Sequence, residues 1–282
     1  MNVVEIEHLC YTYPGADKPT LRDVDLTIEK GDFLAIVGNN GCGKSTLCKT
    51  LNGLIPQFIT GEFSGRVRVC GLDAAGTDVG ALARKVGYVY QDFENQIIRP
   101  TVLDDASYAC LNYALPDYLD RGRQALAQCG LQGREADFIW QLSGGQTHLL
   151  ALAGVLSLQP EVLILDEPSA GLDPAGRRSL LKNIKEYHRE RGTTVVMVSH
   201  SMDEVAENVD RIIVLADAGV VMSGTPREVF SRAGELVAVG LDVPQVTRVA
   251  MALRQRGVDI DSAVYTVADL RRALNAVRGG TC

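Results

Sequence analysis

Residues 38–46 constrain the fold of this chain more than any other segment, because they read Gly-Asn-Asn-Gly-Cys-Gly-Lys-Ser-Thr. They fit the pattern G-x-x-x-x-G-K-[ST], in which glycines let the backbone close around a phosphate chain and point N–H groups at it. An apolar stretch, residues 33–37, precedes the loop, and a helix-like stretch, residues 44–52, follows it. This order of strand, loop and helix is the context that a phosphate-binding loop requires; a glycine-rich turn that binds nothing is the competing interpretation.

The loop predicts ATP and Mg²⁺ as ligands, because each of its parts has a use in holding phosphate. We expect Lys44 to reach the β- and γ-phosphates and the Ser45 hydroxyl to hold Mg²⁺. Tyr13, about 25 residues before the loop, is a candidate for stacking on adenine, with a half-buried strand aromatic as the alternative. The other candidate nucleotide-binding residues are those of the loop itself, Gly38, Asn39, Asn40, Gly41, Cys42, Gly43 and Thr46.

A second candidate anion site lies about 100 residues further on, where residues 141–146 read Gln-Leu-Ser-Gly-Gly-Gln. Residues 148–153 then show the apolar spacing of a helix, and Ser143 and Gln146 have the spacing of a capping box at its start. Gly144 and Gly145 would let a phosphate approach the backbone closely. One ATP does not need two such cradles in one subunit. We therefore expect Ser143 to serve a γ-phosphate held by another copy; an ordinary helix N-cap is the alternative.

Two acidic residues follow the apolar run of residues 162–165, which is typical of a buried strand. Nucleotides bind at the carboxyl ends of parallel strands, so the side chains at this end are candidates for catalysis. Asp166 suits the coordination shell of Mg²⁺. Glu167 points in a different direction and suits a base that polarises the attacking water. Two ordinary surface acids after a strand are the alternative.

Two further strand-like runs end in polar side chains that belong to the same candidate site. Residues 86–90 lead into Gln91, whose amide is expected to contact the metal or the attacking water. Residues 194–199 lead into His200, whose imidazole is placed to sense the γ-phosphate. Each is an ordinary loop residue in the competing interpretation. Residues 169–173, which follow the acidic pair, are expected to form a turn that reaches across a dimer interface.

These motifs, in this order, resemble those of ATP-binding cassette (ABC) ATPases over residues 3 to about 232: the loop 38–46, Gln91, residues 143–146, Asp166 with Glu167, residues 169–173 and His200. The segments 88–96, 224–230 and 240–246 look more narrowly like those of energy-coupling factor (ECF) transporter ATPases. The resemblance implies an ABC-type ATP-binding domain over residues 1–240, with an appendage over residues 241–282.

The ECF resemblance implies an ATP-hydrolysing subunit that couples MgATP binding and hydrolysis to uptake of a vitamin or metal ion. Its expected partners are a second ABC ATPase, identical or different, a transmembrane scaffold protein and a small substrate-binding membrane protein. The expected location is the cytoplasmic face of the cell membrane, as a peripheral subunit. A conventional ABC transporter ATPase and a slow-turnover regulatory subunit remain alternatives, and a soluble ABC protein acting on ribosomes or DNA is disfavoured.

The chain departs from the family pattern at two places. His148 and Leu149 stand where a glutamine and an arginine usually follow the signature, and Asp92-Phe93 stands where Asn-Pro usually follows the loop glutamine. Leucine cannot make the charged hydrogen bonds by which the arginine tethers the signature helix. We expect these changes to affect hydrolysis rate and partner choice rather than ATP binding.

Composition agrees with this assignment. The net charge is −7 and no basic block is present, so nucleic acid is not an expected partner. No apolar run approaches the roughly 18 residues that span a bilayer, and the first residues lack a signal-peptide pattern. A membrane role is therefore expected to depend on protein partners. The seven cysteines show no C-x-x-C spacing and are expected to be core residues or free thiols.

The predicted fold class is α/β: a P-loop NTPase core, an antiparallel β subdomain, a helical signature subdomain and a small C-terminal helical appendage. We expect the antiparallel part at residues 3–30 with 65–72 and the helical insert at about residues 100–158. Residues 211–216 and 220–223 predict a late strand pair. In the appendage, the spacing predicts one helix over residues 244–256 and a second that begins at Thr266, with a capping box to Asp269.

Overall fold

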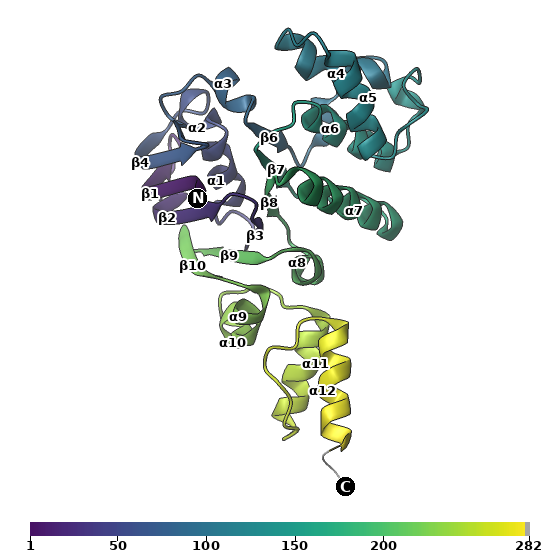
Figure 1. Ribbon diagram of the computed structural model, residues 1–282. Coiled ribbons are helices and arrows are strands. Elements are labelled where there is room, and N and C mark those ends of the chain that lie inside the picture. The colour runs from purple at the N-terminus through teal and green to yellow at the C-terminus, as the bar shows by residue number, and fades with distance from the viewer. Residues whose placement is uncertain (280–282) are drawn as a thin grey trace.

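The computed structural model describes residues 1–279 and has a mostly parallel sheet at its centre (Figure 1). Within these residues the sheet has six strands in the order β10-β9-β3-β8-β7-β6, and only β10 runs antiparallel to its neighbour. Every residue of β3, β6, β7 and β8 is buried, because layers of structure cover both faces of the sheet. The bounds are β3 Phe33–Gly38, β6 Val86–Val89, β7 Val162–Asp166, β8 Thr194–Val198, β9 Arg211–Ala216 and β10 Gly219–Gly224.

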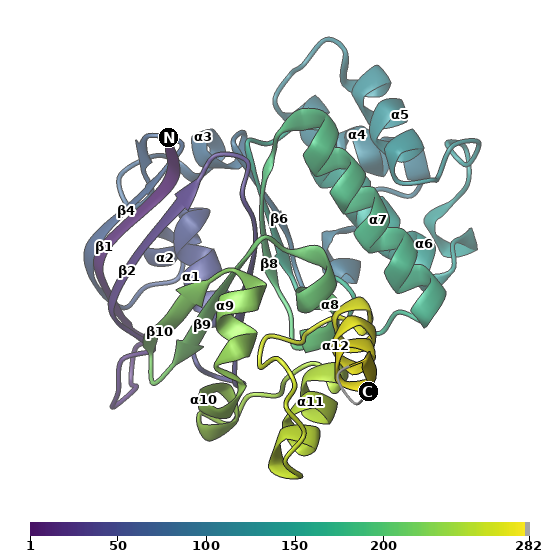
Figure 2. The same cartoon turned by 60° about the horizontal axis from the view of Figure 1, so that its bottom comes forward.

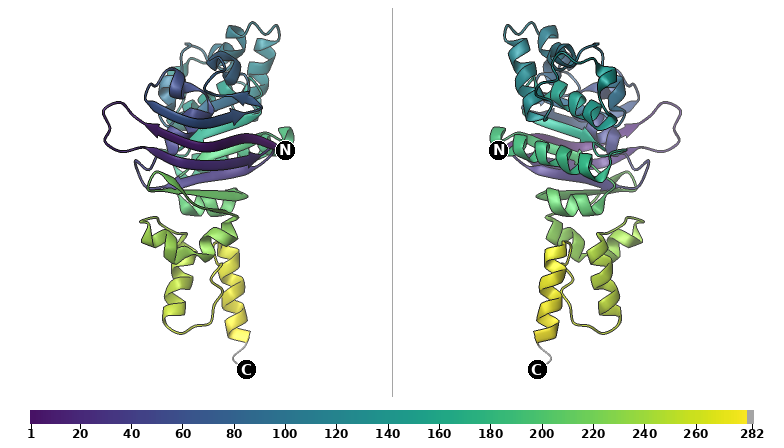
Figure 3. Two further views of the ribbon diagram at one scale, coloured as in Figure 1. Left: turned by 90° about the vertical axis from the view of Figure 1, so that its left-hand side faces the viewer. Right: turned by 90° about the vertical axis from the view of Figure 1, so that its right-hand side faces the viewer.

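An antiparallel sheet in the order β2-β1-β4-β5 lies over one face of the core, and it faces the viewer in the left-hand view of Figure 3. Buried and exposed residues alternate along most of β2, as in a sheet with one solvated face. Helix α1, Lys44–Leu51, is sandwiched between the two sheets through Leu47 and Leu51. The strands are β1 Asn2–Thr12, β2 Leu21–Glu29, β4 Glu62–Val69 and β5 Leu72–Asp73, so β4 begins three residues before the predicted position.

Between β6 and β7 the chain forms a helical lobe, which lies at the top right of Figure 1. Its helices are α4 Val102–Asn112, α5 Tyr118–Gln128 and α6 Gly144–Leu156. Short 3₁₀ turns precede α4 and α6, at Phe93–Gln96 and Ile139–Gln141. The lobe carries the signature segment on a helix whose buried residues join the main core.

Helix α7, Pro174–Arg191, is the longest helix of the described chain, and the sequence analysis did not identify it. Its signals are nevertheless ordinary: Asp173 caps its start, proline opens its first turn, and Gly192 ends it with a φ of 64°. The remaining short helices are α2 Leu54–Gln57, α3 Val79–Ala83, α8 Met202–Asn208, α9 Pro226–Ser231 and α10 Ala233–Ala238.

The C-terminal segment forms two helices, α11 Gln245–Gln255 and α12 Val267–Gly279, which lie side by side below the cassette (Figures 1 and 2). A small apolar cluster joins them: Ala250 of α11 packs with Ile260 and Val264 of the connecting segment, and Leu270 and Ala273 of α12 pack against it. The predicted capping box of the second helix is confirmed, because Thr266 Oγ1 accepts the N–H of Asp269 and Asp269 accepts the N–H of Thr266, both at 3.1 Å. Residues 280–282 of the predicted appendage lie outside the described residues. No helix of residues 1–279 has the length and apolar character needed to cross a membrane.

Candidate nucleotide-binding site

The loops that follow β3, β6, β7 and β8 meet at one edge of the core sheet, because these parallel neighbours end on the same side. They enclose an open cavity of about 660 Å³. The structure thereby brings together most of the residues that the sequence nominated. The lining consists of Tyr13, Thr20, Asn40, Gly41, Gly43, Lys44, Ser45, Thr46, Gln91, Glu167 and His200.

The phosphate loop has a backbone that requires glycine at two of its positions. Gly41 and Gly43 have φ values of 77° and 106°, and a Cβ on Gly43 would lie 2.7 Å from the carbonyl oxygen of Thr20. Lys44 is buried, and its ammonium donates to the carbonyl oxygens of Gly38 and Asn39 at 2.9 and 3.0 Å. The loop's own carbonyls therefore hold this cation beside the cavity, where phosphate oxygens would be the stronger acceptors.

Three nominated residues of the same loop do not line this cavity. Gly38 ends β3 and packs so closely that a Cβ there would lie 2.4 Å from the carbonyl oxygen of Leu215. Asn39 and Cys42 line a neighbouring cavity, which shares Thr20, Asn40 and Gly41 with this one. Burial raises the pKa of the Cys42 thiol, which therefore stays protonated near neutral pH.

Tyr13 lies at the rim of the cavity, but its hydroxyl is used within the protein. It forms a hydrogen bond of 3.1 Å with the Thr46 hydroxyl, and its ring meets that of Tyr11 edge-on. These contacts fix the orientation of the ring beside the phosphate loop. Stacking of Tyr13 on adenine remains a prediction.

Asp166 is the last residue of β7, next to Glu167, and is only 4% exposed; it is not among the residues that line the cavity. Its Oδ2 accepts a hydrogen bond of 3.0 Å from the Tyr88 hydroxyl, and burial raises the pKa of that tyrosine, so it remains a donor. Its Oδ1 is buried and has no hydrogen-bond partner among residues 1–279. A buried carboxylate oxygen without a partner is costly, and coordination to a divalent cation would relieve that cost.

Glu167 has an unusual backbone, with a φ of 52° in the left-handed region that non-glycine residues rarely adopt. Its N–H bonds to the carbonyl of Val198 on the neighbouring strand, which holds this conformation in place. The carboxylate then meets His200, with Oε1 2.7 Å from Nε2. Strained backbone of this kind concentrates at functional sites, so the outlier supports a functional hypothesis for Glu167.

The second candidate anion site lies elsewhere, on a cavity of about 810 Å³ between the start of α6 and the turn before α7. The predicted capping box is confirmed: Gln146 N–H donates to Ser143 Oγ, and Ser143 N–H donates to Gln146 Oε1. Gly144 and Gly145 belong to the first turn of α6, as a capping box at Ser143 requires. Among the described residues, none lines both this cavity and the cavity of the phosphate loop. The chain therefore does not place Ser143 against its own phosphate loop.

The two departures from the family pattern touch each other, which the sequence analysis did not predict. The ring of Phe93 packs against that of His148, which is 4% exposed. Burial lowers the pKa of His148 to about 4, so it is neutral at physiological pH, and its Nδ1 has no partner in the described chain. Leu149 packs against the main core beside it. The sequence did contain one indication that His148 is buried, namely the apolar spacing of this helix.

Glu204 is a further residue that sequence reasoning missed. It lies in α8, four residues after His200, and its Oε2 accepts a hydrogen bond of 2.9 Å from Ser169. Its Oε1 lies 3.0 Å from the guanidinium of Arg177 on α7. The turn at residues 169–173 is therefore attached to the helix that follows His200. No motif marked Glu204, because a glutamate on a short helix is ordinarily a solvated side chain.

Comparison with known proteins identifies the family of this chain. The family described as "ABC transporter" matches residues 21–170, and a shorter match to an AAA domain family covers residues 138–206. The energy-coupling factor transporter ATP-binding protein EcfA1 of Lacticaseibacillus paracasei is 42% identical over 259 residues, which are 91% of each chain. EcfA of Enterococcus faecium is 38% identical over 268 residues, 94% of each chain.

Solved structures agree with the sequence relatives. CbiO1 of Clostridium perfringens, described as part of the ABC transporter complex CbiONQ, has a TM-score of 0.75 and 32% identity, and covers 91% of this chain and 97% of its own. A bacterial ABC transporter cassette solved as a dimer has a TM-score of 0.68 and 26% identity over 79% of this chain and 98% of its own. The predicted α/β P-loop NTPase fold is confirmed, and the protein is an ATPase. The chain belongs to the ABC transporter family, as an ATP-binding subunit of the energy-coupling factor group.

Proposed function

We propose that the chain hydrolyses MgATP as one subunit of an ECF-type importer and thereby drives uptake of a vitamin or metal ion through membrane partners. The observation that carries the catalytic part is the cavity in which Lys44, Gln91, Glu167 and His200 meet. The names of the EcfA relatives, and the description of CbiO1 as part of a transporter complex, support the transport part.

In this proposal, Glu167 accepts a proton from the water that attacks the γ-phosphate, and His200 orients its carboxylate. A base must lie within hydrogen-bond reach of the proton that it takes, and Glu167 borders the cavity in which the water would lie. The His200 Nε2 contact at 2.7 Å limits the rotation of the carboxylate. Gln91 enters the same cavity from the end of β6 and would contact the water or the metal.

Ser45, Gln91 and Asp166 are the residues that would hold Mg²⁺. The partnerless Oδ1 of Asp166 and the hydroxyl of Ser45 are oxygen donors, which suit a hard divalent cation. When bound, Mg²⁺ neutralises charge on the β- and γ-phosphate oxygens. The Tyr88 hydroxyl donates to the other oxygen of Asp166 and so keeps this carboxylate oriented.

The signature residues Ser143, Gly144, Gly145 and Gln146 would complete the ATP site of a second ABC ATPase. Ser143 and Gly144 are exposed, and the cavity beside them is open to solvent. A head-to-tail pair of cassettes would place each signature against the partner's phosphate loop. ABC ATPases do dimerise, as the solved dimeric cassette illustrates.

The appendage is a candidate for a second contact between the paired ATPases. Val249 and Leu274 are 46% and 37% exposed, and Val267 at the start of α12 is 69% exposed. We propose that this apolar surface meets the partner's appendage and holds the pair together after hydrolysis. Val267→Glu should then increase dissociation of the ADP-bound pair, measured by size exclusion with light scattering; unchanged association would exclude Val267 from the interface.

The surface for the transmembrane scaffold is an apolar cavity of about 340 Å³ between the core and the helical lobe. Tyr90, Tyr108 and Leu158 contribute to its lining, and Ile98 at its edge is 63% exposed. A groove of this character suits an amphipathic helix of the scaffold protein. Contact there would hold the subunit at the cytoplasmic face of the membrane and connect movement of the Gln91 loop to the scaffold.

The experiment that tests the transport role is the composition of the assembly in native membranes. The tagged chain should extract in mild detergent with a second ATPase, a scaffold protein and a small membrane protein, as measured by intact mass. Ile98→Glu should remove the membrane proteins, whereas Val221→Glu, a similarly exposed valine on β10, should retain them. An assembly without a small membrane protein would contradict the ECF assignment and favour a conventional ABC transporter.

A further inference from the structure

Residues 239–245, here called the strap, lead from α10 into the first residue of α11 and form hydrogen bonds to the phosphate loop and to α8. The side-chain amide of Asn39, in the phosphate loop, donates a hydrogen bond of 2.8 Å to the carbonyl oxygen of Val239. At the other end of the strap, Asp203 Oδ1 accepts the N–H of Gln245 at 3.1 Å. The strap is therefore held at one end by the phosphate loop and at the other by the helix that follows His200.

At the phosphate-loop end, the fit between the loop and the strap is close. Asn39 carries two contacts at once, because its carbonyl accepts from the Lys44 ammonium while its side chain reaches Val239. Gly240 has a φ of 81°, and a Cβ on it would lie 3.1 Å from the Asn39 amide nitrogen. Any shift of the loop at Asn39 therefore changes a hydrogen bond and a van der Waals contact with the strap.

At the other end, Asp203 supplies what the start of α11 lacks. The N-cap residue of this helix is Pro244, whose side chain makes no capping hydrogen bond. The first N–H groups of a helix have no partner inside the helix, and a carboxylate beside them is favourable. Asp203 lies in α8, three residues after His200, so the first tail helix begins on a residue of the helix that follows the His200 loop.

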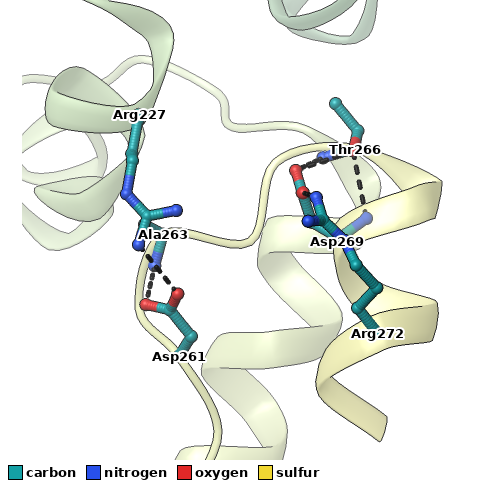
Figure 4. A network of polar contacts seen from close by, with 6 residues as sticks. All are labelled: Arg227, Asp261, Ala263, Thr266, Asp269 and Arg272. Atoms are coloured by element: carbon teal, nitrogen blue, oxygen red, sulfur yellow. Dashed lines mark hydrogen bonds and ion pairs between the residues drawn. The ribbon is translucent and has the colours of Figure 1, made fainter. Parts of the chain in front are cut away.

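The strap packs against the main core, and residues that follow α11 contact α9 of the cassette. Leu241 and Val243 are buried in the main core. Further along, Tyr265 stacks on Phe230, with ring centroids 5.9 Å apart. Figure 4 shows the polar contacts: Asp261 accepts from Arg227 of α9, which joins the appendage to the cassette. The other contacts are local, because Asp261 accepts the N–H of Ala263, and Asp269 accepts from Thr266 and Arg272 at the start of α12.

We infer that Asn39 and Asp203 are positioning residues through which the strap couples nucleotide binding to the placement of the C-terminal appendage. This inference rests on the proposed function, because it requires nucleotide in the cavity beside Lys44. A nucleotide that draws Lys44 toward its phosphates also orders the phosphate loop. It thereby fixes the side-chain amide of Asn39, which donates to Val239 of the strap. Coupling between two equilibria is reciprocal, so loss of the strap contacts weakens nucleotide binding by the factor by which nucleotide stabilises the strap.

The test is amide hydrogen exchange of the strap and of the first turn of α11, with and without MgADP. ADP is a suitable probe because it lacks the γ-phosphate that would bring the signature of a second cassette against the phosphate loop. MgADP should slow exchange in the strap in the full-length protein. Asn39→Ala and Gly240→Ala should each remove this effect and weaken ADP binding about fivefold, the factor that corresponds to one net hydrogen bond.

Gly240→Ala tests the same contact from the strap, because the three atoms nearest to a Cβ at position 240 all belong to Asn39. Asp203→Ala should likewise release the first turn of α11. Glu207→Ala removes a charge from the same helix, where the structure gives its side chain no hydrogen bond to the appendage, and should behave as wild type.

The outcomes separate the inference from the proposed function. ADP binding without any change in strap exchange would overturn the coupling and leave the nucleotide site standing. Weaker ADP binding in Asn39→Ala with normal strap protection would show that Asn39 acts on the nucleotide directly, and would also overturn it. Failure of the wild-type protein to bind MgADP would overturn the proposed site itself and the coupling with it.

Discussion

The phosphate-loop side and the signature side of this molecule are built in different ways. On the phosphate-loop side, Lys44, Asp166 and Glu167 each have a partner of opposite polarity within the same chain. On the signature side, the hydrogen bonds that the structure shows for Ser143 stay within the start of its own helix, to Gln146 and Thr147. The helix beneath it packs through Phe93, His148 and Leu149. The chain itself orients the side chains of the phosphate-loop side, whereas the signature side is proposed to contact another subunit.

The largest effect expected from this difference is at Glu167. Glu167→Gln keeps the size of the side chain but removes the proton acceptor, so ATP turnover should fall about 10²-fold or more while ATP binding persists. Turnover by phosphate release and affinity by equilibrium binding are the measurements. Lys44→Ala is the contrasting variant, because it should weaken binding itself. Near-normal turnover of Glu167→Gln would show that Glu167 is not the base.

Mixing two inactive variants should show whether the two halves meet across subunits. Lys44→Ala disables the phosphate loop, and Ser143→Arg blocks the signature surface. If identical chains pair head to tail, half of the pairs are mixed and each mixed pair has one intact site, so turnover should recover to about a quarter of wild type. A mixture of either variant with itself is the control. No recovery would mean that two copies of this chain do not share sites.

The packing beneath the signature helix predicts an acid sensitivity of the fold. The pKa of His148 is lowered to about 4, so between that value and its usual 6.5 the unfolded chain binds a proton that the folded chain does not. Stability therefore falls as pH falls through this window, by about 2 kcal/mol between roughly pH 7.5 and 5. Urea unfolding at both pH values measures it. His148→Gln should flatten this dependence, whereas exposed His8→Gln should leave it in place; an unchanged slope in His148→Gln would show that another group is responsible.

The smallest expected effect is at Leu149. This leucine is half-buried at the edge of the signature cavity, which Glu94 also lines, so an arginine there has a carboxylate within the same cavity. Leu149→Arg should raise turnover about two- to fivefold, the range of one exposed ion pair, if the missing tether limits the rate. Leu149→Met controls for the change of shape. A stable arginine variant with unchanged turnover would show that local packing has replaced the tether.

The sequence predicted the parts of the molecule that short, local patterns encode. The phosphate loop, the strand before Asp166 and the capping boxes at Ser143 and Thr266 depend on neighbours within a few residues, so spacing alone revealed them. The order of these motifs, which resembles that of ABC ATPases, then predicted the fold.

Contacts between distant segments were not predictable in this way. Phe93 and His148 are 55 residues apart, Ser169 and Glu204 are 35 apart, and Asn39 and Val239 are 200 apart. Their pairing follows from how the helical lobe, α8 and the strap are placed in three dimensions. Helix α7 was missed for a different reason: its charged residues mask a buried stripe that contains Leu180, Ile184 and Tyr187.

The left-handed backbone at Glu167 has a consequence for how this chain would evolve under different pressures. A glutamate there costs about 1 kcal/mol of folding free energy, whereas a glycine would adopt the same φ of 52° without that cost. A library selected only for thermal stability should therefore enrich glycine or asparagine at position 167 and lose hydrolysis as it does so. Glutamate should be retained only under selection for transport. The residue found at position 167 therefore shows whether a selected chain was selected for activity or for stability alone.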